Sequence, residues 1–170
     1  MRSSDSKTRK AGCAILGIIS EGCRDSLRPV LSSIMPALLS LVTDPEFMVR
    51  EVSCFAMGQF AEHCQPEVLQ YHASVLPAMF HCLEDTKNTV QGTACYVLEM
   101  YCEHLSKETL RPFLQPLLTR LGSILQSPKA LIKEMGLSAI AAIAVAAEDD
   151  FLPYADVSYL LLFEYIDIDI

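Results

Sequence analysis

The feature that most constrains this fold is an internal repeat of about 41 residues. Two columns of identical residues recur at that spacing: Cys13, Cys54 and Cys95, and Glu21, Glu62 and Glu103. A repeat of this length, with room for two helices, is typical of a helical solenoid, in which each unit packs only against its neighbours. The 170 residues therefore predict an all-α array of about four units.

The stretch from Asp44 to Pro66 marks one unit most clearly. Asp44 is expected to cap a helix by accepting hydrogen bonds from its free N–H groups. Pro45 suits the first helical position, where a missing N–H costs nothing. Apolar residues then recur every three to four positions, as at Val49 and Phe60. We expect this helix to end near His63.

The same pattern divides the chain into repeats, each with a first (A) and a second (B) helix. The predicted units are a half repeat at 7–23, repeats at 27–65, 66–105 and 106–148, and a half repeat at 149–170. The expected A helices cover 28–42, 67–83 and 110–125, and the expected B helices cover 45–63, 87–104 and 128–147. Pro36, Pro77 and Pro116 recur inside the A helices, where each removes a hydrogen bond and bends the helix.

Both ends depart from the repeat. The chain starts on a B helix, and residues 165–170 alternate isoleucine and aspartate with the period of a strand. We expect an internal fragment of a longer protein, with a tail after residue 157 that does not continue the array.

Composition narrows the classes of function. A net charge of −8 argues against nucleic acid as a partner and favours basic proteins. Seven cysteines without a CxxC spacing indicate reduced thiols and no metal site. The apolar run Gly136 to Ala147 is shorter than a membrane span of about 20 residues, so no membrane is expected. No nucleophile elbow, phosphate loop or HExxH motif is present, which predicts neither an enzyme nor a cofactor.

Proline-bent A helices, the Asp-Pro turn, a Val-Arg pair and the period resemble HEAT repeats. The segments ISEGC, DPEFMVREVSCFAMGQFAEHCQPEVLQYH, SVLPAMF and SAIAAIAVAAEDDFLPYA resemble importin-4-like karyopherin-β nuclear import receptors, especially plant members, over residues 7 to 157. The resemblance implies a right-handed solenoid that carries basic cargo, of the histone or ribosomal type. It also implies release by Ran-GTP, binding of Phe-Gly nucleoporins, and shuttling between cytoplasm and nucleus.

The resemblance implies a ladder in which the carboxylate of each turn meets a helix arginine of its own or the next repeat. Asp44, Arg50 and Asp85 occupy its positions, and Lys133 keeps the basic charge in the fourth unit. Gln91 replaces the base in the third unit and Ser127 replaces the following acid. The alternative is an ordinary cap beside a solvated arginine. Arg120 is expected on an exposed part of an A helix.

Glu21, Glu62 and Glu103 are the candidate cargo-binding residues. They lie near the ends of successive B helices, where a carboxylate opposes the helix dipole, so local helix stability does not explain them. The resemblance puts B helices on the inner, cargo-facing side of the solenoid. The alternative is three solvated helix ends copied with the repeat, and Val145 breaks the column in the fourth unit.

Tyr71, Phe80 and Phe113 are the candidate nucleoporin-binding residues, because they lie on A helices, which the resemblance puts on the outer face. Core packing is the alternative for each of them. At the level of the whole chain, the alternative to a transport receptor is a static HEAT-repeat scaffold. Dependence on Ran-GTP distinguishes the two.

Overall fold

The computed structural model describes residues 3–155. Its elements, in chain order, are α1 (Ser6–Leu27), η1 (Arg28–Val30), α2 (Leu31–Leu39), α3 (Phe47–His63), η2 (Glu67–Tyr71), α4 (His72–Leu83), α5 (Asn88–Cys102), α6 (Lys107–Ile124), α7 (Ala130–Ala147) and η3 (Glu148–Phe151), where η marks a short 3₁₀ helix. No strand occurs among these described residues, so the predicted all-α fold class is confirmed. The expected alternation at 165–170 lies outside them.

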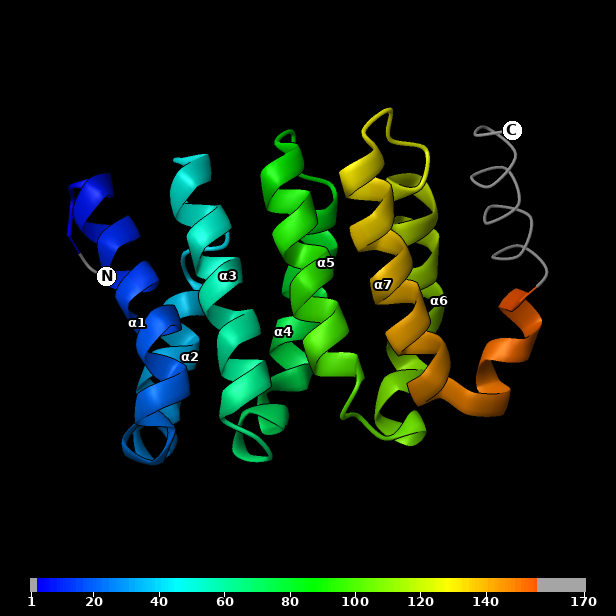
Figure 1. Cartoon of the computed structure of the whole chain (residues 1–170), viewed down its shortest axis with the longest axis horizontal. Helices are drawn as coiled ribbons and strands as arrows, with labels where there is room; N and C mark the ends of the chain where they lie inside the picture. The colour runs from blue at the N-terminus through cyan, green and yellow to red at the C-terminus, as the bar shows by residue number, and fades with distance from the viewer. Residues whose placement is uncertain (1–2, 156–170) are drawn as a thin grey trace.

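The helices form two layers. The B helices α1, α3, α5 and α7 stand side by side in one layer, and α2, α4 and α6 lie behind them (Figure 1). The core between the layers is continuous along the array. Its fully buried side chains include Met35, Leu38, Met57, Phe60, Leu76, Leu98, Tyr101 and Leu117. Each layer alone would expose one apolar face, so stacking of the two layers stabilises both.

The recurring cysteines Cys13, Cys54 and Cys95 are fully buried, as small spacers between the layers. Burial raises the pKa of the Cys13 thiol to about 11 and that of Cys95 to about 12. These thiols are therefore neutral at physiological pH and poor nucleophiles. Nowhere in residues 3–155 do three His, Cys, Asp or Glu side chains group closely enough to hold a metal ion.

The B helices α3, α5 and α7 begin later than the sequence suggested, and Asp44 is not a helix cap. Helix α3 starts at Phe47, and its N-cap is Glu46, which makes no side-chain cap hydrogen bond. The Asp44 Oδ1 instead accepts a hydrogen bond from the Glu46 N–H at 3.0 Å, closing a turn before the helix. Asp85 and Ser127 make the same contact with the residue two positions on, at 2.9 and 3.3 Å. An aspartate in such a turn can direct its second oxygen toward another helix.

The A helices also differ in detail from the prediction. The first two start with a 3₁₀ turn, η1 or η2, before α2 or α4, and such turns are frequent at the ends of α-helices. The third, α6, is a continuous helix with Pro112 and Pro116 inside it. Helix α1 runs to Leu27, and its only non-helical residue is Cys23, where the sequence had ended it.

One stretch, Ala130–Ala155, is long and apolar enough by length and composition to cross a bilayer. The core helix of a water-soluble protein passes the same test. Here α7 packs against α5 and α6, and three acidic residues follow it at 148–150. The absence of a membrane partner remains a prediction.

Candidate functional site

A row of ion pairs joins successive repeats along the edge where the B helices begin, which we call the ladder edge. In the first, the Arg9 Nε donates to Asp44 Oδ2 at 2.7 Å, and its Nη2 donates to Oδ1 at 2.9 Å. The third nitrogen of Arg9 donates to the backbone carbonyls of Ser3 and Ser4. All three guanidinium nitrogens of Arg9 therefore donate hydrogen bonds to the protein.

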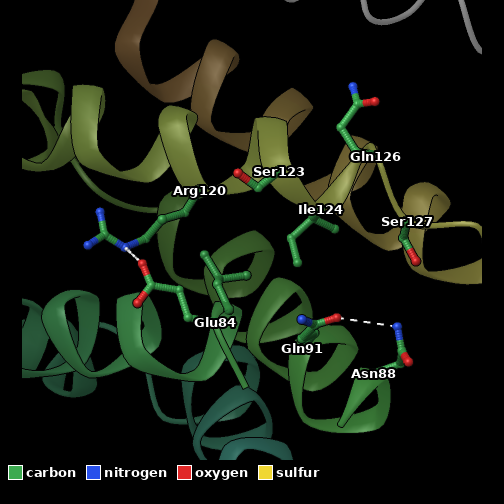
Figure 2. Close-up of a pocket in the computed structure, with 9 residues that line it drawn as sticks. Glu84, Asn88, Gln91, Arg120, Ser123, Ile124, Gln126 and Ser127 are labelled. Carbon is green, nitrogen blue, oxygen red and sulfur yellow. Dashed lines mark hydrogen bonds and ion pairs between the residues drawn. The ribbon is translucent and has the colours of Figure 1, made fainter. Parts of the chain in front are cut away.

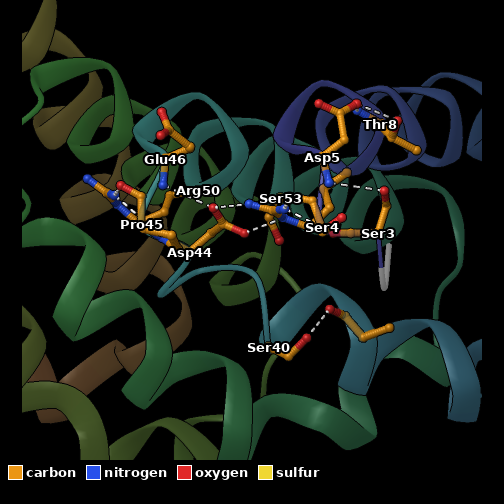
Figure 3. Close-up of polar contacts among 12 residues, drawn as sticks. Ser3, Ser4, Asp5, Thr8, Ser40, Asp44, Pro45, Glu46, Arg50 and Ser53 are labelled. Atoms are coloured by element: carbon orange, nitrogen blue, oxygen red, sulfur yellow. Dashed lines mark hydrogen bonds and ion pairs between the residues drawn. The ribbon is translucent and has the colours of Figure 1, made fainter.

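Arg50 repeats this arrangement one unit further along. Its Nε and Nη2 donate to the two oxygens of Asp85 at 2.6 and 3.0 Å, and its Nη1 donates to the Asp44 carbonyl at 2.8 Å. Figure 3 shows Arg50 beside Asp44 and Pro45 of its own turn. Each arginine thus binds the carbonyls of its own turn and the carboxylate of the next repeat. The Arg50 and Asp85 side chains are only 14% and 6% exposed.

The arginines shift the pKa values of both aspartates. The hydrogen bond from Arg9 holds the pKa of Asp44 below its ordinary value, against the opposing effect of burial. Burial acts to raise the pKa of Asp85, but the hydrogen bonds from Arg50 and from the Lys87 N–H outweigh it, so that pKa is also lowered.

These lowered pKa values predict an acid-dependent loss of stability. A carboxyl group with a lower pKa in the folded state stabilises the protein above its unfolded pKa of about 3.9, and this contribution is lost as the pH falls through the folded value. We expect the free energy of unfolding, measured in urea by circular dichroism, to fall below about pH 4. The double variant Asp44→Asn with Asp85→Asn should show a shallower decrease. An unchanged slope would show that other carboxylates cause the loss.

The ladder stops at the next unit. Gln91 donates from Nε2 to its own turn carbonyl, Asp85 O, at 2.9 Å, and it accepts a hydrogen bond from Asn88 at 3.4 Å. Ser127, in place of the next acid, closes its turn and makes no ion pair (Figure 2). Lys133 lies half-buried on α7, and the repeat position that would supply its acid falls beyond residue 155, outside the described residues.

A second set of ion pairs, which the sequence did not suggest, lies along the opposite edge, where the A segments begin. Arg28 pairs with Glu67 at 3.2 Å and donates to the Gln65 carbonyl at 2.7 Å. Arg111 pairs with Asp150 at 2.7 Å. In both pairs an Arg-Pro dipeptide precedes the acid by 39 residues, which is the signal that could have identified them.

The three candidate cargo-binding glutamates lie on three adjacent B segments. Glu21 is exposed on α1, Glu62 lies on α3, and Glu103 directly follows α5. The Glu62 and Glu103 side chains are 44% and 54% exposed. Tyr96 fixes Glu62 by donating from its hydroxyl to Oε2 at 2.8 Å. Burial and this carboxylate together raise the pKa of Tyr96 to about 12, so the hydroxyl remains a donor.

The three candidate nucleoporin-binding aromatics are half-buried and pack against the core. The Phe113 ring meets His72 edge to face, with 6.3 Å between ring centres. The Arg120 guanidinium lies over the Phe80 ring, 4.8 Å from its centre. Of the three, Tyr71 lies in η2 rather than in an α-helix.

Arg120 is not the solvated residue that the sequence suggested. Besides covering Phe80, it lies with Nε 2.9 Å from Glu84 Oε1, and its side chain is 30% exposed. Helices α4 and α6 are neighbours in the A layer, which brings these residues together although they are far apart in the sequence. Arg120 therefore links two successive repeats within the A layer.

Comparisons with known proteins place this solenoid in a family. A family model described as importin subunit beta-1-like, TPR repeats, matches residues 3–169. Solved structures of the karyopherin Kap121p, alone and bound to Nup53p, superpose with a TM-score of 0.93 and 32% sequence identity over 99% of this chain. The chain spans 17% of the length of Kap121p. No curated protein matches the chain by sequence.

The fold thus defines the class: a stack of helical repeats of the karyopherin type. The chain belongs to the importin-β family. The predicted HEAT-repeat solenoid and the karyopherin resemblance are confirmed at that level. This family comprises transport receptors that are not enzymes.

Proposed function

We propose that this chain is a segment of a nuclear transport receptor and that its B-helix face binds basic protein cargo. The observation that carries the proposal is the exposed column of Glu21, Glu62 and Glu103 on three adjacent B segments. Family membership supports it, and so do the structures of Kap121p bound to Nup53p and to Pho4p. The sequence segments from ISEGC to SVLPAMF favour an importin-4-like receptor of plant type.

The geometry of the column suits a segment rich in lysine and arginine. Packed helix axes lie about 8–10 Å apart, a distance that about three residues of extended chain can span. One exposed ion pair contributes about 0–1 kcal/mol, so binding requires several glutamates acting together. Glu99 adds a fourth carboxylate close to Glu103, and burial together with that neighbour raises the pKa of Glu99. A basic side chain nearby would favour the ionised form of Glu99.

The proposed receptor releases its cargo, of the histone or ribosomal protein type, when Ran-GTP binds. It passes the pore by binding Phe-Gly nucleoporins between its A helices and shuttles between cytoplasm and nucleus. Tyr71, Phe80 and Phe113 are the candidate contacts, and Arg120 must leave the Phe80 ring before another aromatic can stack there. A static scaffold would hold its partner regardless of Ran-GTP, so cargo release separates the two functions.

Charge reversal of the column tests the proposal. We expect the triple variant Glu21→Lys, Glu62→Lys and Glu103→Lys to bind a lysine-rich peptide about tenfold more weakly at low salt, because exposed charges act most strongly there. Fluorescence anisotropy of a labelled peptide, titrated with the chain at several salt concentrations, measures the affinity and its salt dependence. Circular dichroism reports whether the fold is intact.

A matched control carries the same change in net charge at other exposed sites. The triple variant Glu46→Lys, Glu108→Lys and Asp149→Lys changes acids at the starts of helical segments and leaves the column intact. It should bind the peptide nearly as tightly as the unaltered chain. Equal losses in the two variants would indicate a general charge effect and would refute the cargo-binding column.

A further inference from the structure

Each pair of successive repeats meets at a joint, and the joints differ in their ion pairs. The first joint, from α1 to α2 and α3, carries Arg9–Asp44. The second, from α3 to α4 and α5, carries Arg50–Asp85 on the ladder edge and Arg28–Glu67 on the opposite edge. The fourth, from α6 and α7 to residues 148–155, carries Lys107–Glu148 and Arg111–Asp150 on the opposite edge.

The third joint, from α5 to α6 and α7, lacks the buried Arg–Asp pair of the ladder, and the ion pair that does cross it, Arg120–Glu84, is more exposed. On the ladder edge, Gln91 and Ser127 occupy the positions of the arginine and the aspartate. On the opposite edge, Gln70 donates to the Glu67 carbonyl of its own segment at 2.7 Å. Within residues 3–155, no ion pair connects segment 66–71 to segment 106–112. At the third joint, the changes to Gln91 and Ser127 on the ladder edge therefore coincide with the absence of an ion pair between segments 66–71 and 106–112 on the opposite edge.

The packing between B helices changes at the same joint. Phe55 of α3 lies against Gly17 of α1, where an added Cβ would sit 3.0 Å from the ring, and Tyr96 of α5 lies against Gly58 of α3. The repeat positions that continue this series are Glu99 and Ser138, so the third joint has neither the glycine nor the aromatic ring. Its close contact is instead between Gly92 and the Met135 side chain, which is flexible and adapts to different separations.

The ladder edge is also more open at the third joint. A cleft of about 480 Å³ lies there, and its lining includes Gln91, Ser127 and the paired side chains of Glu84 and Arg120 (Figure 2). The corresponding cleft at the second joint, beside Arg50 and Asp85, measures about 330 Å³. The pair Arg120–Glu84 crosses the third joint with side chains that are 30% and 61% exposed, whereas the Arg50 and Asp85 side chains at the second joint are 14% and 6% exposed. An exposed pair restrains motion less than a buried one.

We propose that the third joint is the hinge of this segment, the point at which the array bends as two rigid bodies. Helices α1 to α5 form one body and α6 and α7 form the other. Hinges absorb motion at the few positions where packing and polar contacts are weakest. Glu21, Glu62 and Glu103 all lie on the first body, so bending preserves their spacing while α7 moves relative to them.

Distance distributions between paired spin labels test the hinge. Labels on an unnatural ketone amino acid, at exposed Ser32, Ser74 and Gln115, leave the native cysteines unmodified. The 32/74 pair spans the second joint and the 74/115 pair spans the third. Pulsed electron paramagnetic resonance on the full chain should show a 74/115 distribution about twice as broad as the 32/74 distribution.

Two double variants exchange the properties of the joints. Gln91→Arg with Ser127→Asp builds the missing ion pair and should narrow the 74/115 distribution to the width of the 32/74 one. Arg50→Gln with Asp85→Ser removes the neighbouring pair and should broaden the 32/74 distribution. Equal widths in the unaltered chain, or no narrowing by the first variant, would overturn the hinge. The comparison in the unaltered chain holds even if the second variant does not fold.

Discussion

Replacing Arg50 with alanine is expected to lower the free energy of unfolding by about 2–3 kcal/mol, because the change leaves a buried carboxylate without its partner. Asp85 is 6% exposed, and Arg50 of the preceding repeat donates two of the three hydrogen bonds that its carboxylate accepts, the third coming from the Lys87 N–H. The Asp44 carbonyl also loses a donor. Urea denaturation followed by circular dichroism measures the change.

Arg111→Ala is the matched control. Arg111 pairs with Asp150 through the same atoms at 2.7 Å, but the arginine is 61% exposed. Water replaces its contacts, so the loss should be much smaller than that caused by Arg50→Ala. Arg120, which the sequence suggested as a silent site, is unsuitable because it covers Phe80 and pairs with Glu84. If Arg50→Ala and Arg111→Ala lower the free energy of unfolding equally, burial does not determine how much the ladder ion pairs stabilise the protein.

A larger side chain at Gly58 is expected to be equally damaging. Gly58→Val should lower the free energy of unfolding by about 2–3 kcal/mol, because overpacking a close helix contact displaces the neighbouring helix or ring. A Cβ at Gly58 would overlap the Tyr96 ring. That ring cannot move freely, since its hydroxyl donates to Glu62 at 2.8 Å and contacts Gln59. Chemical denaturation of the variant measures the loss.

Two comparisons isolate the cause. Gly22 has nothing within 4 Å of an added Cβ, so Gly22→Val should change the stability by less than about 0.5 kcal/mol. Adding Tyr96→Ala to Gly58→Val should recover part of the loss, because the two side chains no longer compete for one space. Additive effects of the two substitutions would show that the valine acts through the helix backbone and not through the ring.

Most of the fold could be predicted from the period of the sequence repeat. Columns 41 residues apart indicated the number of units, and apolar residues at helical spacing predicted which segments are helices. These signals are local or periodic, so a single sequence displays them. The predicted starts of the helices were less accurate, because an Asp-Pro pair can either cap a helix or form a turn that ends before the helix begins. The Asp44 contact with Glu46 decides for the turn.

The sequence identified the ladder positions, but it did not choose between an arginine that binds its own turn and one that binds the next. The structure shows both, with the carbonyls of one turn and the carboxylate of the next held by a single side chain, Arg50. It also shows Arg28–Glu67, whose members lie in different repeats and match no familiar motif.

What the sequence alone determined about this protein is therefore its periodic content: an all-α array, its helices and the family resemblance. Which side chains meet between repeats was decided only by the tertiary structure, because those contacts depend on how far each helix is shifted and rotated against the next. Arg120 shows this best: nothing near it in the chain predicts Phe80 and Glu84, which reach it from the adjacent A helix. Helix stacking, set by the shape of the buried core, brings them together.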